Sequence, residues 1–218
     1  MACSCASLIA STARHFDERR VRKELANYRR AGPTATTLGL LSQLTPIEPP
    51  PEAILDIGSG IGALTFGMLE AGVRRAICVD LSQPALAANA EEAQRRGMGH
   101  RIERVSGDFV AIAATLPLVD LVALDRVVCC YPDFVPLLNQ ATAHSRHLLA
   151  ISYPRDRWWV RLAVRIENGW RRLRGDGFRA FVHPPASMQG LLHRHGFTRS
   201  RTLLSFTWQM EVYTRNAA

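Results

Sequence analysis

The feature that most constrains how this chain can fold is a glycine-rich segment, ILDIGSGIGALT (54–65). An apolar run that predicts a buried strand here meets a pattern that predicts a helix. Gly58, Gly60 and Gly62 join the two, and three glycines let the backbone turn sharply beside a ligand at the helix N-terminus. Asp80 lies 22 residues after Gly58, at the end of the next apolar run, where an acid can bind ribose hydroxyls. The segment therefore predicts a nucleoside-binding α/β fold.

Beyond this segment, apolar runs alternate with helical patterns. The runs that predict strands are 53–57, 75–80, 101–108, 120–128 and 147–154, and those that predict intervening helices are 62–72, 83–97 and 133–145. Such alternation predicts a parallel sheet with helices on both faces. The end of the chain differs, because helices over 157–173 and 188–197 precede the strand-like runs TRSRTLLSFT and WQMEVYTR. We expect these last two runs to form an antiparallel hairpin.

The remaining organisation is that of one domain spanning 1–218. Residues 14–44 have a largely helical pattern, broken near Gly32 and Pro33, and the proline-rich segment 45–52 ends it. We expect four parts, which are an N-terminal helical cap (1–50), a cofactor-binding core (51–154), a helical insertion or lid (155–186), and a final helix with the strand pair (187–218).

Asp56 bears on which nucleoside ligand is bound. Its carboxylate stands two residues before Gly58, where it would repel the pyrophosphate of a dinucleotide in a partly dry site. Ala63 also stands where a dinucleotide fingerprint often has its third glycine. A carboxylate there favours a ligand with an ammonium and a sulfonium group, and S-adenosylmethionine is such a ligand.

The segment D-x-G-x-G-x-G (56–62), Asp80 and the segment SGDF (106–109) resemble the class I S-adenosylmethionine-dependent methyltransferases. The resemblance is clear over residues 50–154. It implies a Rossmann-like fold with a mostly parallel seven-stranded sheet, helices on both faces and a C-terminal antiparallel hairpin. The whole chain is also similar to bacterial methyltransferase-domain proteins, and distantly to magnesium-protoporphyrin methyltransferases.

The resemblance also implies roles for individual residues. It places Asp56 and the three glycines around the methionine moiety of the cofactor, and Asp80 on its ribose. Asp108 would accept a hydrogen bond from the adenine amino group, or else serve a turn after Gly107. Phe109 would contact the adenine ring. Asp125 and Arg126 would lie near the transferred methyl group.

Methyl transfer from a sulfonium is an in-line displacement in which the protein mainly positions the acceptor and excludes water. A base is needed only if the acceptor must lose a proton. Asp125, Tyr131 and His183 are the candidate catalytic residues. Each has a structural alternative, since Asp125 can cap a turn, Tyr131 can pack, and a lone histidine such as His183 is more often structural.

The net charge of +8 favours an anionic partner, but the charge is unevenly distributed. Residues 51–150 carry eleven acidic and eight basic side chains, whereas residues 151–218 carry four acidic and twelve basic ones. The acidic middle fits a cationic cofactor, and the basic end fits an anionic acceptor. The helix predicted over 157–173 has arginines on its outer face and is either a lid over the acceptor or a solvated helix whose tryptophans pack inward.

The cysteines do not predict a metal site. Cys3 and Cys5 near the start, and Cys129 and Cys130 after the fourth strand, lack the spacing of a zinc site. No run approaches the roughly 18 apolar residues of a membrane span. The first residues also lack the basic region of a signal peptide, so we expect a cytoplasmic protein with free thiols.

Four functions remain open on the sequence. The leading one is a methyltransferase acting on a small-molecule, anionic or aromatic acceptor. An RNA methyltransferase is the first alternative, favoured by the basic C-terminal third but lacking an (N/D)PP(Y/F) signature after the fourth strand, so nucleic acid is not the favoured partner. A nicotinamide-dependent oxidoreductase is disfavoured by Asp56. A non-catalytic protein would bind S-adenosylmethionine without turnover. The oligomeric state is not fixed by the sequence.

Overall fold

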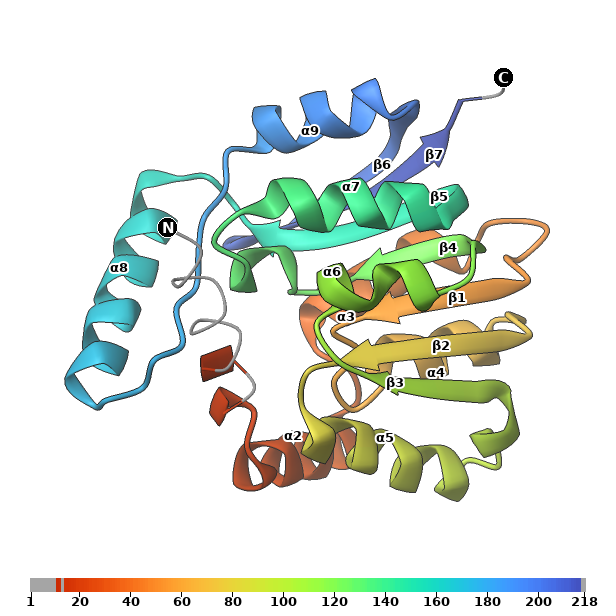
Figure 1. Cartoon of the computed structure of the whole chain (residues 1–218), viewed down its shortest axis with the longest axis horizontal. Helices are drawn as coiled ribbons and strands as arrows, with labels where there is room; N and C mark the ends of the chain where they lie inside the picture. Colours follow the sequence, from red (N-terminus) through yellow and green to blue (C-terminus); the bar gives the residue numbers. More distant parts are fainter. Residues whose placement is uncertain (1–10, 13, 217–218) are drawn as a thin grey trace.

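The computed structural model describes residues 11, 12 and 14–216, which form a seven-stranded sheet with helices on both faces (Figure 1). The strands are β1 (Ala53–Ile57), β2 (Arg75–Asp80), β3 (Ile102–Ser106), β4 (Val119–Leu124), β5 (Ser145–Pro154), β6 (Phe197–Leu204) and β7 (Trp208–Arg215). Their order in the sheet is β3-β2-β1-β4-β5-β7-β6. The first five pair in parallel, and β7 runs antiparallel to both β5 and β6. The Rossmann-like sheet with a closing hairpin is thus confirmed.

The helices form one layer on each face of the sheet. One layer contains α2 (Glu18–Ala31), α3 (Ala35–Leu44), α4 (Ala63–Glu70) and α5 (Gln83–Arg95), and the other contains α6 (Phe109–Ile112), α7 (Phe134–His144) and α9 (Pro185–Arg194). Alternation along the strands supplies both layers, since Ile54 of β1 faces the first and Leu55 the second. Every residue of β1 is buried, as a central strand covered on both faces requires.

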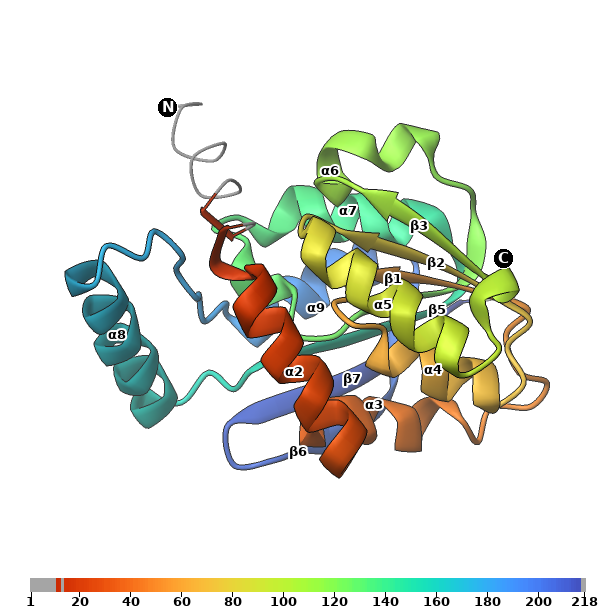
Figure 2. The same ribbon diagram turned by 90° about the horizontal axis from the view of Figure 1, so that it is seen from below.

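Helix α8 (Trp158–Leu173) belongs to neither layer and stands at the edge of the molecule (Figure 2). Trp158 and Trp170 are 73% and 56% exposed, so the alternative in which the tryptophans of this helix pack inward is wrong for these two. Trp159 is half-buried, and its ring stacks on Phe206 at a centroid distance of 5.9 Å. Within the described residues, no helix is both long enough and apolar enough to cross a membrane.

Two expected boundaries shift for local reasons. The strand expected over 120–128 ends at Leu124, because Arg126 takes a positive φ of 61° and a 3₁₀ turn (Val128–Cys130) follows. The helix expected over 188–197 begins earlier, at Pro185, since a proline is well suited to the first turn of a helix. The break expected near Gly32 is confirmed, with a φ of 78° at that glycine between α2 and α3.

A buried carboxylate ties α2 to the rest of the fold. Glu92 of α5 is fully buried and accepts hydrogen bonds from Arg29 of α2 at 2.9 Å and from Arg95 and Arg96 on its own helix. Hydrogen bonding from these guanidinium groups, led by that of Arg95, lowers the pKa of Glu92 to about 2. The cap is therefore held against the core by a charged cluster as well as by apolar contacts.

Candidate functional site

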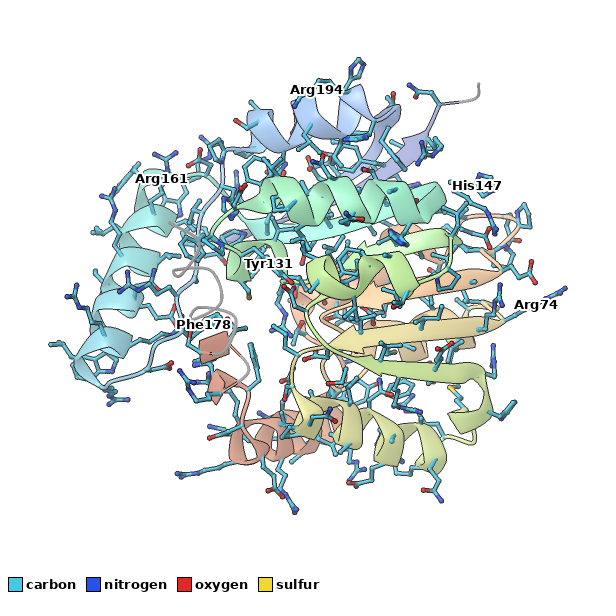
Figure 3. All side chains as sticks on the ribbon, in the orientation of Figure 1. Arg74, Tyr131, His147, Arg161, Phe178 and Arg194 are labelled. Carbon is cyan, nitrogen blue, oxygen red and sulfur yellow. The ribbon has the colours of Figure 1, made fainter. Side chains whose placement is uncertain are left out.

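A cavity of about 640 Å³ opens at the carboxyl ends of β1, β2 and β4. The strand order reverses between β1 and β4, and in sheets of this type ligands bind where it does. Residues of α2 and α8, and of the segments next to them, complete the wall. Figure 3 shows Tyr131 and Phe178 on this side of the sheet, between the strand ends and α8.

The three loop glycines are required for different reasons. All have a positive φ, of 63° at Gly58, 55° at Gly60 and 88° at Gly62. A Cβ at Gly58 would lie 2.4 Å from Val127, and one at Gly62 would lie 2.3 Å from the Asn89 amide nitrogen. A Cβ at Gly60 would meet no atom within 4 Å. Because Gly58 and Gly60 line the cavity, a side chain at Gly60 would enter the space a ligand needs.

Asp80 lies on the cavity wall at the end of β2, as the sequence predicts. Its Oδ2 accepts a hydrogen bond of 2.8 Å from the Gly60 amide, and its Oδ1 accepts one of 2.8 Å from the Ser82 amide. Burial raises the pKa of Asp80, and these amide hydrogen bonds oppose the rise. The carboxylate is thus held in one orientation, with lone pairs left for a ligand.

Asp56 does not lie on the wall. It is 1% exposed beneath the loop, where Oδ2 accepts a 2.6 Å hydrogen bond from Thr65 and Oδ1 has no described partner. Burial raises its pKa to about 7. The side chain is therefore only partly ionised at neutral pH, which weakens the expectation that its charge selects a cationic ligand.

The second acid of the predicted adenine site is engaged with a predicted catalytic residue. Asp108 caps α6 by accepting from the Val110 amide at 3.3 Å, and it also accepts a hydrogen bond from the Tyr131 hydroxyl. Burial, followed by this contact with Asp108, raises the pKa of Tyr131 well above its ordinary value. Tyr131 and Phe109 both line the cavity, whereas Asp108 stands behind Tyr131. A phenol that already donates its proton to a carboxylate is a poor general base.

Asp125 is the candidate base that the structure brings to the cavity in a defined orientation. Its two oxygens accept hydrogen bonds of 2.6 Å each from Thr37 of α3 and Ser152 of β5. The Ser152 hydroxyl in turn accepts a 2.8 Å hydrogen bond from the Arg126 amide. Positive φ in a residue such as Arg126 is uncommon and is concentrated at functional sites.

His183 is not brought to the cavity. Its Nε2 donates to the carbonyl oxygens of Tyr131 at 2.9 Å and Val128 at 3.2 Å, and its ring packs between Phe134 and Phe181. Burial lowers its pKa. These contacts favour the structural alternative for His183, because its ring holds the turn that carries Tyr131.

His15, Arg171 and Phe178 line the cavity on the side away from the strand ends, and we call them the roof. The sequence did not single out these residues. Nδ1 of His15 donates a 2.6 Å hydrogen bond to Asp176, the His15 ring stacks on Phe178 at a centroid distance of 4.2 Å, and burial lowers the pKa of His15. The Arg171 guanidinium lies 4.8 Å from the centre of the Phe178 ring. His15 and Asp176 are 161 residues apart, so no local pattern could have joined them.

Two arginines that line the cavity each have one side-chain nitrogen that is buried and has no hydrogen-bond partner in the described chain. These atoms are Nε of Arg126 and Nη1 of Arg171. Arg126 makes a long side-chain contact, in which its Nη2 lies 3.5 Å from Oε1 of Glu24. Such unsatisfied donors can be paired by a bound anion.

The thiols near the site are hydrogen-bonded within the protein. Cys129 and Cys130 each donate to the Arg126 carbonyl oxygen at 3.4 Å, and the hydrogen bond with Cys130, followed by burial, raises the pKa of Cys129. Cys3 and Cys5 lie outside the described residues. Over 11, 12 and 14–216, no group of three or more metal-ligating side chains could hold an ion.

Comparison with known proteins finds a family that matches the core of this chain. Residues 54–148 match the family described as "Methyltransferase domain". The ribosomal protein L11 methyltransferase of Serratia proteamaculans (strain 568) is 35% identical over 72 residues, which are 33% of this chain and 25% of that protein. The chain thus matches about a quarter of the length of such curated relatives.

Solved structures share the fold over more of the chain. The magnesium protoporphyrin IX methyltransferase of Synechocystis PCC 6803, crystallised with S-adenosylhomocysteine, superposes with a TM-score of 0.64 at 18% identity, covering 94% of this chain and 85% of that one. An O-methyltransferase family protein from Burkholderia thailandensis superposes with a TM-score of 0.71 at 13% identity, covering 92% and 61%. At these identities the likeness shows the fold.

Proposed function

We propose that the protein transfers a methyl group from S-adenosylmethionine to a small-molecule acceptor that is anionic, aromatic or both, since residues 54–148 match the methyltransferase-domain family. The observation that carries this proposal is one cavity in which the glycine loop and Asp80 form one side and a partly unsatisfied pair of arginines beside an aromatic roof forms the other. The first side suits a nucleoside, and the second suits the acceptor.

The residues of the first side fit the cofactor. Gly58 and Gly60 bring bare backbone to the cavity, and Asp80 presents an oriented carboxylate at the distance along the chain expected for ribose recognition. Phe109 supplies an apolar wall for the base, and Tyr131, held by Asp108, lies next to it. When bound, S-adenosylmethionine supplies an activated methyl group on a sulfonium.

The protein's own contribution is to position the acceptor and to keep water out. The roof of His15, Phe178 and Arg171 offers flat rings and a guanidinium, which favour a planar acceptor or one with a negative charge. The free donors of Arg126 and Arg171 would bind a carboxylate or phenolate of the acceptor. Asp125, fixed by Thr37 and Ser152, would accept the proton that a hydroxyl or amine acceptor loses.

RNA is the alternative acceptor, favoured by twelve basic against four acidic side chains in residues 151–218. Against it, the cap and the α8 segment both line the cavity, and a partly covered space of about 640 Å³ suits a small molecule better than a strand of nucleic acid. Tight binding to bulk RNA that weakens steeply with salt would favour the RNA alternative.

Calorimetry with S-adenosylhomocysteine tests the cofactor, and absence of binding to the wild-type protein would refute the proposal. Transfer of labelled methyl groups from S-adenosylmethionine to a panel of carboxylated, phenolic and uncharged aromatic compounds then tests the acceptor. We expect transfer to anionic members, and a loss of that preference in Arg126→Gln. Binding of the cofactor with no transfer to any acceptor class, RNA included, would indicate a non-catalytic protein.

A further inference from the structure

Helix α8 has its apolar face toward solvent, which is the reverse of an ordinary helix on a globular core. Five large apolar side chains recur at helical spacing along this face, and most are more than half exposed. They are Trp158 (73% exposed), Leu162 (49%), Ile166 (64%), Trp170 (56%) and Leu173 (82%), and together we call them the α8 face.

The opposite side of the same helix is the one that contacts the protein. Val164, Glu167 and Arg171 line the cavity, and Val160 is buried. These positions lie about half a turn away from Leu162 and Ile166 on a helix of 3.6 residues per turn. One face of α8 thus lines the cavity. The other carries the exposed apolar side chains, which face solvent.

The hairpin between β6 and β7 extends this surface. Phe206 is 76% exposed and stacks on Trp159 at the start of α8, and Leu204 is 53% exposed. Both views show α8 at the periphery of the molecule (Figures 1 and 2). Contiguous exposed apolar surface of this kind marks a binding site for a partner or a membrane.

The charge around the stripe identifies the partner. Residues 157–174 contain the six arginines Arg157, Arg161, Arg165, Arg171, Arg172 and Arg174, with Glu167 as the one acidic residue. Arg165 and Arg172 are exposed, and neither has an ion pair among the described residues. An apolar stripe with tryptophans and flanking arginines is the pattern of a helix that lies in the interface of an anionic bilayer.

We propose that the α8 face docks on the surface of a membrane rich in anionic lipid, with its apolar side chains at the headgroup boundary and its arginines on the lipid phosphates. This attachment involves one face of one helix and does not require a membrane-spanning segment. The inference goes beyond the proposed function and holds whatever the methyl acceptor is.

The test is flotation of the full-length protein with vesicles, in the absence of any methyl donor. We expect binding to vesicles of equal parts phosphatidylcholine and phosphatidylglycerol, weaker binding to phosphatidylcholine alone, and a blue shift of tryptophan fluorescence from Trp158 and Trp170. The double variant Leu162→Gln/Ile166→Gln should weaken partitioning by about a hundredfold, since two apolar side chains no longer enter the interface. The double variant Arg165→Gln/Arg172→Gln should weaken it by about thirtyfold on anionic vesicles only.

Leu38→Gln is the matched control, because Leu38 of α3 is 51% exposed but lies outside the α8 face. It should leave partitioning unchanged, and thermal unfolding should show that all variants fold. Failure of the wild-type protein to bind anionic vesicles would overturn the proposal, as would an equal effect of Leu38→Gln. A wild-type dimer in sedimentation that Leu162→Gln/Ile166→Gln converts to a monomer, without vesicle binding, would instead assign the face to a second copy of this chain.

Discussion

Replacing Asp80 by alanine is the change whose effect on the cofactor can be worked from the structure. Both carboxylate oxygens of Asp80 accept backbone hydrogen bonds of 2.8 Å, from Gly60 and Ser82, and the residue lines the cavity. The remaining lone pairs are those expected to receive the two ribose hydroxyls. Asp80→Ala removes these acceptors while leaving the rest of the cavity wall in place.

The magnitude follows from the two lost hydrogen bonds to a charged acceptor. Each is worth about 1.5–3 kcal/mol, so the affinity for S-adenosylhomocysteine should fall by about a hundredfold or more. Stability should also fall, by about 1–3 kcal/mol, because the Gly60 and Ser82 amides lose their acceptor. Burial raises the pKa of Asp80, so affinity in the wild-type protein should strengthen as pH rises and the carboxylate ionises.

Asp120→Ala is the matched control for the loss of stability. Oδ2 of Asp120 also accepts two backbone hydrogen bonds, from Glu52 at 2.9 Å and Ala53 at 3.0 Å, but it does so at the opposite end of the sheet. Isothermal calorimetry and urea denaturation on both variants separate the two effects. We expect similar losses of stability and a large loss of affinity in Asp80→Ala alone.

The reasoning would be refuted by a folded Asp80→Ala that binds S-adenosylhomocysteine within about threefold of the wild-type affinity. An equal loss of affinity in Asp120→Ala would also refute it, because the effect would then reflect general destabilisation and not contact with the ligand.

Three further predictions concern buried polar side chains that do not line the cavity. Burial raises the pKa of Asp56 from 3.8 to about 7, so its contribution to stability is present below pH 4 and is lost as pH rises to about 7. Asp56→Asn should therefore gain stability relative to the wild type between pH 4 and 7 in urea denaturation, and parallel pH curves would contradict this. His183→Gln retains an N–H donor toward the Tyr131 carbonyl and should keep S-adenosylhomocysteine affinity and most of the melting temperature, whereas His183→Ala should unfold at a lower temperature. A change in the pH profile of methyl transfer in His183→Gln would restore a catalytic role. Glu92→Gln should lower stability by about 3 kcal/mol and speed hydrogen exchange in α2, because three guanidinium groups lose their buried partner. Glu91→Gln, at a 63% exposed partner of Arg29, should do neither.

The geometry of the half proposed to bind the nucleoside could be predicted, because its determinants are close together in the sequence. The strand, the glycine loop and the next strand end fall within residues 53–80, and sheet geometry brings their carboxyl ends to one edge. Asp80 and Gly60 are where that reasoning places them. Asp56 shows its limit, since alternation along β1 turns the side chain under the loop, and periodicity of a fully buried strand does not tell which face a polar residue meets.

The acceptor half could be predicted only in part. The sequence indicated Asp125, Arg126 and the helix over 157–173, but three distant segments build the geometry around them. Asp125 is oriented by Thr37, 88 residues earlier, and by Ser152, 27 residues later. His183 was a candidate catalytic residue on the sequence, but its ring is directed at the backbone carbonyls of Val128 and Tyr131. No local pattern in a sequence distinguishes these two outcomes.

The two halves also differ in how their geometry is maintained. The cofactor side rests on β1 and β2, two interior strands of the sheet, so a substitution there is expected to act on both the fold and the ligand. The acceptor side rests on α2, α8 and the segment around Phe178. Polar pairs connect these elements to one another and to the end of β4, such as His15 with Asp176 and Arg126 with Glu24. Exposed lining residues of α8, such as Glu167, can change with little cost to the core. If α8 also docks on a membrane, the residues that choose the acceptor and those that choose the location of the enzyme lie on opposite faces of one helix. Substitutions on one face should then change acceptor preference without changing vesicle binding, and the reverse should hold for the other.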